Sequence, residues 1–267
     1  MAEVLINRDG GIVTVTFNRP EKKNALNVAT WHALDDVIRE ATVNPADRAV
    51  VLTGSGGAFS AGADLSARGD DGKAKEGLAG GAPQPALQEM RMLGDIVARF
   101  RHLPKPTLAV VDGPCVGVAL GLVLACDLVL ASDRARFSSI FVKRGLSLDG
   151  GTSWTLPRAV GMRQAKRMAI FGDMVGAADA LNWGLITEVV PAAELEETGR
   201  EWAARLAAAP TTTVSLIKRL LDDGTSDSFE QAIENEARSQ HIAHTTGDVA
   251  EGIAAFLERR APRFTGQ

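Results

Sequence analysis

The sequence predicts an α/β fold followed by a helical C-terminal region. Apolar, β-branched runs alternate with amphipathic stretches up to about residue 190, and after Pro191 only helical periodicity remains. Strands and helices that alternate in this way form a parallel sheet with helices on its faces. A chain of 267 residues suits one large domain or two small ones. We therefore expect a core, residues 1–190, and a helical region, residues 191–267.

The first elements of the core follow one another in a regular order. Ile12–Phe17 alternates with a period of two and is rich in β-branched residues, which predicts a strand. Asn27 is a typical N-cap for the helix that follows, and residues 49–52 predict a second strand. Residues 66–85 hold many Gly, Ala and charged residues without periodicity. They predict a long loop, and long loops inside compact domains are often functional.

The same alternation continues through the rest of the chain. A helix is expected at residues 86–103, with Leu87 and Met90 among its apolar residues. Residues 117–125 are apolar on every side, which predicts a fully buried helix. Further strands are expected at 107–111 and 127–131, and C-terminal helices at 195–208, 212–221, 229–243 and 249–259.

Composition argues against several classes of partner. The net charge of −4 gives no reason to expect nucleic acid or an anionic membrane surface as a partner. The apolar run at residues 116–124 is too short to span a bilayer, and the first residues do not resemble a signal peptide. Cys115 and Cys126 both lie in apolar sequence, which predicts buried, reduced thiols. We expect a cytoplasmic protein.

The stretch from Ala58 to Leu65 has the composition of a chemically useful turn. It follows an apolar run and places Gly62 and Ala63 at the exit of a strand. Small residues leave backbone N–H groups uncovered, and such groups are what a developing oxyanion needs. A second small-residue turn, residues 112–117, also follows an apolar run. Two such turns can supply the two donors of an oxyanion hole.

An ordered set of short motifs extends along nearly the whole chain. The motifs are Asn18-Arg19-Pro20, Asn24-Ala25-Leu26, Val51-Leu52-Thr53-Gly54, Ser60-Ala61-Gly62-Ala63-Asp64-Leu65, Lys105-Pro106, Asp112-Gly113, Cys126-Asp127, Ala135-Arg136-Phe137, Asp149-Gly150-Gly151, residues 177–184, Val189-Val190-Pro191 and the tail from Phe256 to Phe264. With this set the chain resembles the crotonase (enoyl-CoA hydratase/isomerase) superfamily. The resemblance implies a crotonase-like spiral of ββα units with a helical C-terminal region that builds homotrimers, often paired into hexamers. It also implies an acyl-CoA thioester as ligand, and no cofactor beyond the coenzyme A of the substrate.

The resemblance also implies roles for particular residues. In this family two backbone N–H groups hold the thioester oxygen, and they correspond here to Ala63 and Val118. Val118 stands where the family usually has glycine, so the N–H is kept while the side chain narrows the space. For three of the CoA-binding candidates the sequence leaves an alternative open. Lys22 and Lys23 can be ordinary surface residues, and Phe256 can belong to a helix core. The implied CoA-binding residues are Lys22, Lys23, Ala25, Leu26, Ala61, Asp64 and Leu65, with Phe256 and either Arg259 or Phe264 closing over the nucleotide.

The resemblance weakens at the acid–base residues. Hydratases of the family use two glutamates, and the corresponding positions are Gly121 and Phe141. Neither residue can carry a proton, which disfavours two-carboxylate hydration and also the isomerases that use a single glutamate at the second position. Asp149 remains, in a turn where isomerase-like and dehalogenase-like members have an aspartate that transfers a proton or attacks the substrate. The alternative is that Asp149 caps the helix beginning near Gly150.

Other side chains are weaker candidates. Phe141 and Trp154 are expected to line or underlie an acyl pocket. His241 and His244 are three residues apart on a predicted helix, but no third ligand is evident, so we expect no metal site. The remaining candidates are His32, His102, Cys115, Ser138 and Ser139, for which the sequence shows no activating partner.

The leading hypothesis is an enzyme that binds an acyl-CoA and isomerises an unsaturated acyl group. Ala63 and Val118 polarise the thioester, and Asp149 moves a proton. Two alternatives stay open at this point. One is a non-catalytic acyl-CoA-binding protein on the same fold, and the other is a hydratase with atypical residues.

Overall fold

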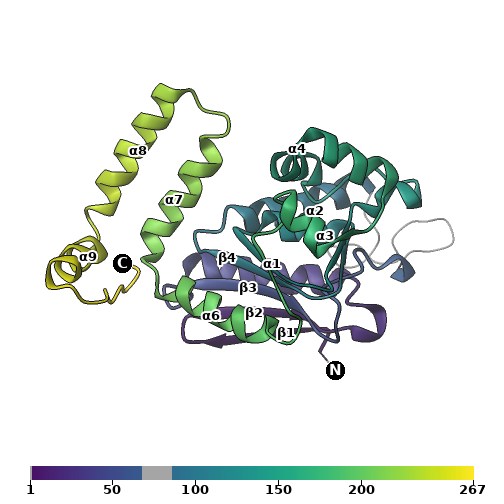
Figure 1. Cartoon of the computed structure of the whole chain (residues 1–267), viewed down its shortest axis with the longest axis horizontal. Coiled ribbons are helices and arrows are strands. Elements are labelled where there is room, and N and C mark those ends of the chain that lie inside the picture. The colour runs from purple at the N-terminus through teal and green to yellow at the C-terminus, as the bar shows by residue number, and fades with distance from the viewer. Residues whose placement is uncertain (1, 68–85) are drawn as a thin grey trace.

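The computed structural model describes residues 2–67 and 86–267 (Figure 1). Within these residues one sheet has the strand order β1-β2-β3-β4-β6-β9 and a smaller sheet has the order β5-β7-β8. In the large sheet β1 and β2 are antiparallel, and the other neighbours are parallel. Most of the loop predicted at residues 66–85 lies outside the described residues. The strands are β1 (Val4–Asp9), β2 (Ile12–Phe17), β3 (Ala49–Gly54), β4 (Thr107–Val111), β5 (Pro114–Val116), β6 (Leu128–Ser132), β7 (Arg136–Ser138), β8 (Val175–Gly176) and β9 (Glu188–Val190).

Most helices lie where the sequence pattern predicts them, whereas the helix at Ala177–Asn182 was not predicted. The side chain of Asn27 caps the first of them, because its Oδ1 accepts the backbone N–H of Thr30 at 3.0 Å. Three short 3₁₀ segments, residues 20–22, 65–67 and 140–144, connect elements near the pocket described below. The helices are α1 (Val28–Val43), α2 (Ala86–Arg101), α3 (Val118–Ala125), α4 (Thr152–Phe171), α5 (Ala177–Asn182), α6 (Leu195–Ala208), α7 (Thr211–Asp223), α8 (Phe229–Ala243) and α9 (Gly247–Glu258).

The two faces of the large sheet carry different helices. Val50 and Leu52 of β3 face the cluster formed with α1, α2 and α3, whereas Val51 faces α6. This alternation is the period-two signature of a strand covered on both sides, and it confirms the predicted α/β core. Helix α3 is buried along its whole length, as its apolar sequence predicts. The strands β1, β5, β7, β8 and β9 were not predicted, and the last four are too short to show a period.

The C-terminal helices fall into two groups. Helix α6 lies on the sheet, where Gly199 brings it close to the side chain of Val110, while α7, α8 and α9 extend away as an arm (Figure 1). The arm exposes large apolar side chains, with Phe229 77% exposed and Phe256 82% exposed. The division at residue 190 stays a prediction, since α6 packs on the core. Among the described residues, no helix combines the length and apolar character needed to cross a bilayer.

Candidate active site

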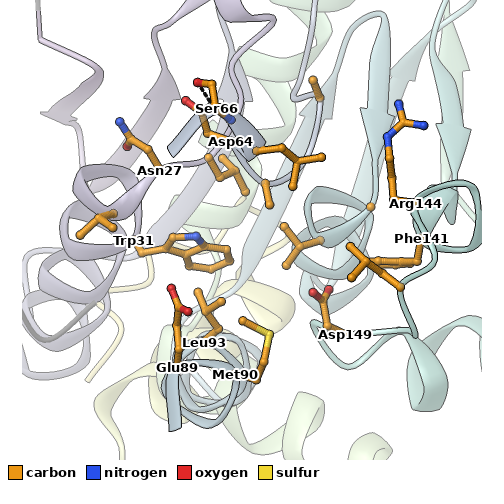
Figure 2. Close-up of a pocket in the computed structure, with 18 of the residues that line it drawn as sticks. Asn27, Trp31, Asp64, Ser66, Glu89, Met90, Leu93, Phe141, Arg144 and Asp149 are labelled. Atoms are coloured by element: carbon orange, nitrogen blue, oxygen red, sulfur yellow. Dashed lines mark hydrogen bonds between the residues drawn. The ribbon is translucent and has the colours of Figure 1, made fainter. Parts of the chain in front are cut away.

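A pocket of about 960 Å³ opens between α1, α2, the start of α3 and the turn before α4. Figure 2 shows the side chains that line it, with Trp31 and Glu89 on one side and Phe141 and Asp149 on the other. The lining includes eight of the residues predicted to form the site. These are Leu26, Ala61, Ala63, Asp64, Leu65, Val118, Phe141 and Asp149.

Two turns form one wall of this pocket, and we call them the backbone wall (residues 60–64 and 113–118). Main-chain hydrogen bonds join them, because the N–H of Ser60 donates to Pro114 O at 2.9 Å and the N–H of Val116 donates to Ser60 O at 3.1 Å. Gly62 has φ +86°, and a Cβ built there would lie 2.8 Å from Val116 O. Only glycine permits both this conformation and this close approach. The two small-residue turns seen in the sequence are therefore in direct contact.

The N–H groups of Ala63 and Val118 are placed by the structure around them. Leu26 pairs with the residues on either side of Ala63, since its N–H donates to Gly62 O and its carbonyl accepts the N–H of Asp64, both at 2.8 Å. In such a bridge the intervening N–H, that of Ala63, points away from the paired strand. Val118 is the first residue of α3, where backbone N–H groups have no acceptor within the helix. Both groups thus belong to the pocket wall and are available as donors.

An ion pair braces the backbone wall at Asp64. Its Oδ2 lies 2.8 Å from Nη2 of Arg19, and both side chains are largely buried. Burial by itself would raise the pKa of Asp64, but hydrogen bonds from Ser66 and Arg19 outweigh it and hold the pKa below its usual value. The backbone around Arg19 is fixed in turn by Asn24, whose side chain accepts the N–H of Arg19 and donates to Ala58 O.

An adjoining wall of the pocket contains the carboxylate turn, residues 145–151. Its position depends on glycines, because a Cβ at Gly121 of α3 would lie only 2.5 Å from Gly150 O. A Cβ at Gly150 would in turn lie 3.1 Å from a methyl group of Val118. Asp149 is thus held close to the first turn of α3, and Figure 2 shows its carboxylate directed into the pocket.

The two positions that the resemblance assigns to glutamates are filled in different ways. Gly121 lies under the backbone of the carboxylate turn, which occupies the space that a side chain would need. Phe141 is buried and lines the pocket with its ring. The backbone of Asp149 closes the turn before α4, since its carbonyl accepts the N–H of Thr152 at 3.1 Å and the hydroxyl of Thr152 at 2.7 Å. The N-cap residue of α4 itself is Gly151.

Two acidic residues of the described lining, Glu3 and Glu89, were missed in the sequence. Glu89 of α2 lines the pocket and is only 8% exposed, whereas Leu87, which the helical pattern placed among the apolar residues, is 63% exposed. A search for apolar periodicity overlooks a charged residue on the buried face of a helix. The spacing could have revealed it, because Glu89 lies four residues before Leu93 and seven before Ile96, on the same face of the helix.

The structure leaves other predicted residues away from the described lining of the pocket. Lys22 and Lys23 are exposed, although the carbonyl of Lys23 accepts the N–H of Ala61 at 2.8 Å. Phe256 and Arg259 lie on the arm, and Arg259 ends α9 with φ +56°. The described lining also omits Ala25, Trp154, His102, His241, His244, Cys115, Ser138 and Ser139, whereas His32 is part of it.

Several of these residues have structural surroundings that explain them. Burial raises the pKa of the Cys115 thiol well above its ordinary value, and the same cause raises that of Cys126. Ser138 donates its hydroxyl to Gly172 O at 3.0 Å. The ring of Trp154 stacks with the guanidinium of Arg158 at 3.8 Å, so it packs on the surface of α4. The raised pKa values of Cys115 and Cys126 favour the protonated thiol, which is a poor nucleophile.

Comparison with known proteins agrees with this geometry. The profile of the enoyl-CoA hydratase/isomerase family matches residues 7–267. A 1,2-epoxyphenylacetyl-CoA isomerase of Escherichia coli is 33% identical, with 100% of both chains covered. A probable enoyl-CoA hydratase of Rhodobacter capsulatus is 38% identical over 96% of this chain and 95% of the relative.

A solved structure supports the same assignment. A putative enoyl-CoA hydratase/isomerase from Mycobacterium abscessus superimposes with a TM-score of 0.89 at 30% identity, covering 99% of this chain and 100% of the other. The similarity therefore includes the arm as well as the core. It supports a coarse function, the enzymatic processing of acyl-CoA. The chain belongs to the enoyl-CoA hydratase/isomerase family, within the crotonase superfamily.

Proposed function

We propose that this protein isomerises an unsaturated acyl-CoA through an enolate of the thioester. The N–H groups of Ala63 and Val118 hold the thioester oxygen, and Asp149 transfers the proton. The observation that carries this proposal is the packing of Gly150 against the side chain of Val118. This packing puts the carboxylate turn, which holds Asp149, next to the turn that holds the Val118 N–H. A base and an oxyanion site on one pocket are the minimum equipment for moving a double bond.

The proposed reaction needs one base and no added atom. The Asp149 carboxylate removes a proton from a carbon next to the double bond or the carbonyl. The electron pair moves toward the thioester oxygen, and the two N–H groups stabilise the negative charge there. Asp149, now protonated, returns the proton to another carbon as the double bond shifts. Each such donor is worth about 10²–10³ in rate, and the first turn of α3 adds favourable dipole.

Isomerisation fits the pocket better than two-carboxylate hydration. At Gly121 there is no space for a carboxylate, because Gly150 O lies 2.5 Å from the position of a Cβ. At Phe141 the pocket wall is an aromatic ring. Of the two relatives named above, one is called an isomerase and the other a probable hydratase. The residues at positions 121 and 141 of this chain favour isomerisation over hydration.

The rest of the substrate extends from these donors. We propose that coenzyme A passes Leu26, Ala61 and Leu65, which line the same pocket. Contacts with Lys22, Lys23 and Ala25, and closure by Phe256 and Arg259 of a neighbouring subunit, remain predictions. The exposed apolar residues of the arm suit assembly into a trimer or hexamer. We propose no cofactor beyond the coenzyme A of the substrate.

Product analysis with a carboxylate variant tests the proposal. The protein is incubated with a panel of enoyl- and dienoyl-CoA esters, and the products are resolved by chromatography and mass spectrometry. We expect a product of unchanged mass with a shifted double bond, and a loss of about 10²–10⁴ in turnover for Asp149→Asn with acyl-CoA binding retained. Asp173→Asn removes an exposed carboxylate that pairs with Lys143, and should leave turnover unchanged. Equal turnover of the wild type and Asp149→Asn on every active ester would refute the role of Asp149.

The alternative is a protein that binds acyl-CoA without converting it. It is favoured by one observation, that Gly121 and Phe141 cannot carry a proton. It predicts saturable binding of acyl-CoA and complete recovery of every ester in the panel. A gain of one water in the product would instead identify a hydratase with atypical residues.

A further inference from the structure

Glu89 is a buried acid in a largely apolar part of the pocket. The side chain is 8% exposed and lines the pocket from α2, together with Met90 and Leu93 of the same helix. Trp31, which is 4% exposed, lines the pocket from α1. In Figure 2 the Glu89 side chain rises from α2 toward Trp31, while Asp149 enters from the other side of the view. Two carboxylates therefore face one pocket from different elements.

The Glu89 carboxylate lacks a counterpart in the described part of the protein. Among residues 2–67 and 86–267, none forms an ion pair with Glu89 or donates a hydrogen bond to its side chain. The Glu89 oxygens are not among the fully buried polar atoms that lack a partner, so they remain accessible from the pocket that the residue lines. A ligand bound in the pocket can therefore supply a hydrogen-bond donor to the Glu89 carboxylate.

The position of Glu89 in its helix indicates which kind of ligand group it suits. Glu89 lies in the first turn of α2. The N-terminal turn of a helix carries a partial positive charge that favours a negatively charged side chain. A carboxylate accepts hydrogen bonds and donates none, so its partner must bring an O–H or N–H group.

We propose that Glu89 binds a hydrogen-bond donor on the acyl group, so that the preferred substrates are acyl-CoA thioesters with a hydroxyl or another donor along the acyl chain. The proposal rests on the proposed function, because it takes the pocket to be the acyl-CoA site. Trp31, Met90 and Leu93 pack against the carbon chain, and Glu89 selects among chains of similar length. A site that hydrogen-bonds a substrate group discriminates strongly against analogues that lack it, because its own polar atom is then left unpaired.

Binding of matched ligand pairs tests this inference. The probes are saturated acyl-CoA esters and the hydroxyacyl-CoA esters of the same chain length, with the hydroxyl moved stepwise along the chain. Saturated chains have no double bond to shift, and mass spectrometry after each titration checks that no hydroxyacyl ester has lost water, so titration calorimetry then measures binding alone. At the best hydroxyl position we expect the wild type to bind about 10- to 100-fold more tightly than the plain chain, the worth of a hydrogen bond to a charged group.

Two variants separate the role of Glu89 from general effects. Glu89→Met keeps an unbranched side chain of similar length but removes the acceptor, and should abolish the preference for the hydroxylated chain while plain chains bind as well or better. Asp95→Asn removes a carboxylate from the same helix, one that is 66% exposed and pairs with Arg99, and should leave the preference unchanged.

The outcomes distinguish this inference from the proposed function. If the wild type binds neither plain nor hydroxylated esters, the proposed function itself fails. If plain chains bind and no hydroxyl position binds more tightly, or if Glu89→Met keeps the preference, the assignment of Glu89 fails while the acyl-CoA site stands. An equal loss of both ligands in Glu89→Met, or a loss of turnover with unchanged binding, would also overturn it, since these indicate a structural or a proton-transfer role.

Discussion

The two walls of the pocket are built in different ways. In the backbone wall the proposed functional groups are main-chain N–H groups, and main-chain hydrogen bonds between Ser60, Pro114 and Val116 hold the two turns together. In the carboxylate turn the proposed functional group is the single side chain of Asp149, positioned by packing of Gly150 on Gly121. A backbone N–H donor is kept whichever side chain its residue carries, unless that residue is proline. The proposed reaction, in contrast, depends on one carboxylate and on the absence of a side chain at Gly121 beneath its turn.

Because of this difference, the sequence of one wall can change without loss of its proposed functional group, whereas that of the other cannot. At Val118 a side chain stands where the resemblance implies glycine, and the N–H remains at the start of α3. At Gly121 and Phe141 a change of side chain removes the acid–base group altogether. The ligand of such a fold is therefore easier to infer than its reaction. Four substitutions, taken in order of their expected effect on turnover, test this comparison.

Gly62→Ala should have the largest effect. The new Cβ would lie 2.8 Å from Val116 O, and φ +86° is strained for alanine, so the two turns must separate. Misplacing one oxyanion donor should lower turnover by about 10²–10³. Gly10→Ala is the matched control, because Gly10 has φ +55° with nothing within 4 Å of its Cβ position. It should cost about 1–2 kcal/mol of unfolding free energy and no turnover. Equal turnover of the two variants would show that the backbone wall does not hold the reacting group.

Gly121→Ala tests the carboxylate turn in the same way. Its Cβ would lie 2.5 Å from Gly150 O and push the turn away from α3. Displacement of a reacting group by about 1 Å can cost about 10²-fold in rate, and we expect a fall of that order in turnover with acyl-CoA affinity largely kept. Gly94→Ala in α2 has nothing within 4 Å of its Cβ and should stabilise the protein slightly. Steady-state kinetics and ligand titration on both variants measure turnover and acyl-CoA affinity. A loss of affinity as large as the loss of turnover would contradict the proposal that the carboxylate turn serves the reaction and not the binding.

The sequence predicts the backbone wall better than the carboxylate turn, for physical reasons. Small residues after an apolar run are visible in the sequence, so the stretch from Ala58 to Leu65 can be recognised directly. The packing of Gly121 on Gly150 joins residues far apart in the chain, and no local pattern announces it. Glu89 was missed because periodicity counts apolar residues, although its side chain is buried on the same face of α2. The short strands of the small sheet, such as β8, are set by tertiary contacts and not by their own propensity.

Val118→Ala should have a modest effect, because the N–H donor stays in place. The lost methyl groups are those that pack against Gly150, and Val118 is 3% exposed. We expect turnover to fall by a few-fold and the free energy of unfolding by about 1–3 kcal/mol. Urea unfolding and steady-state kinetics measure the two quantities. A loss of turnover comparable with that of Gly62→Ala would mean that the side chain of Val118 matters more than its backbone.

Asp64→Asn should affect stability more than turnover, and its effect should depend on pH. The pKa of Asp64 is lowered in the folded protein from its ordinary value of 3.8, so the Arg19 ion pair contributes its full stability above that value. This contribution disappears as the pH falls through the lowered folded pKa. At pH 7 we expect the variant to be about 1–3 kcal/mol less stable than the wild type.

The pH profile of this variant also distinguishes bracing of the backbone wall from a general loss of charge. Between pH 7 and about pH 5 the difference in unfolding free energy should be constant, and it should shrink below about pH 4, as linkage requires for a carboxylate with a lowered pKa. Asp36→Asn removes an exposed partner of Arg39 and should change stability by about 0–0.5 kcal/mol at any pH. If the difference for Asp64→Asn persists undiminished at acid pH, its origin is packing or hydrogen bonding and not ionisation. The Asp64 side chain would then brace the backbone wall without a contribution from its charge.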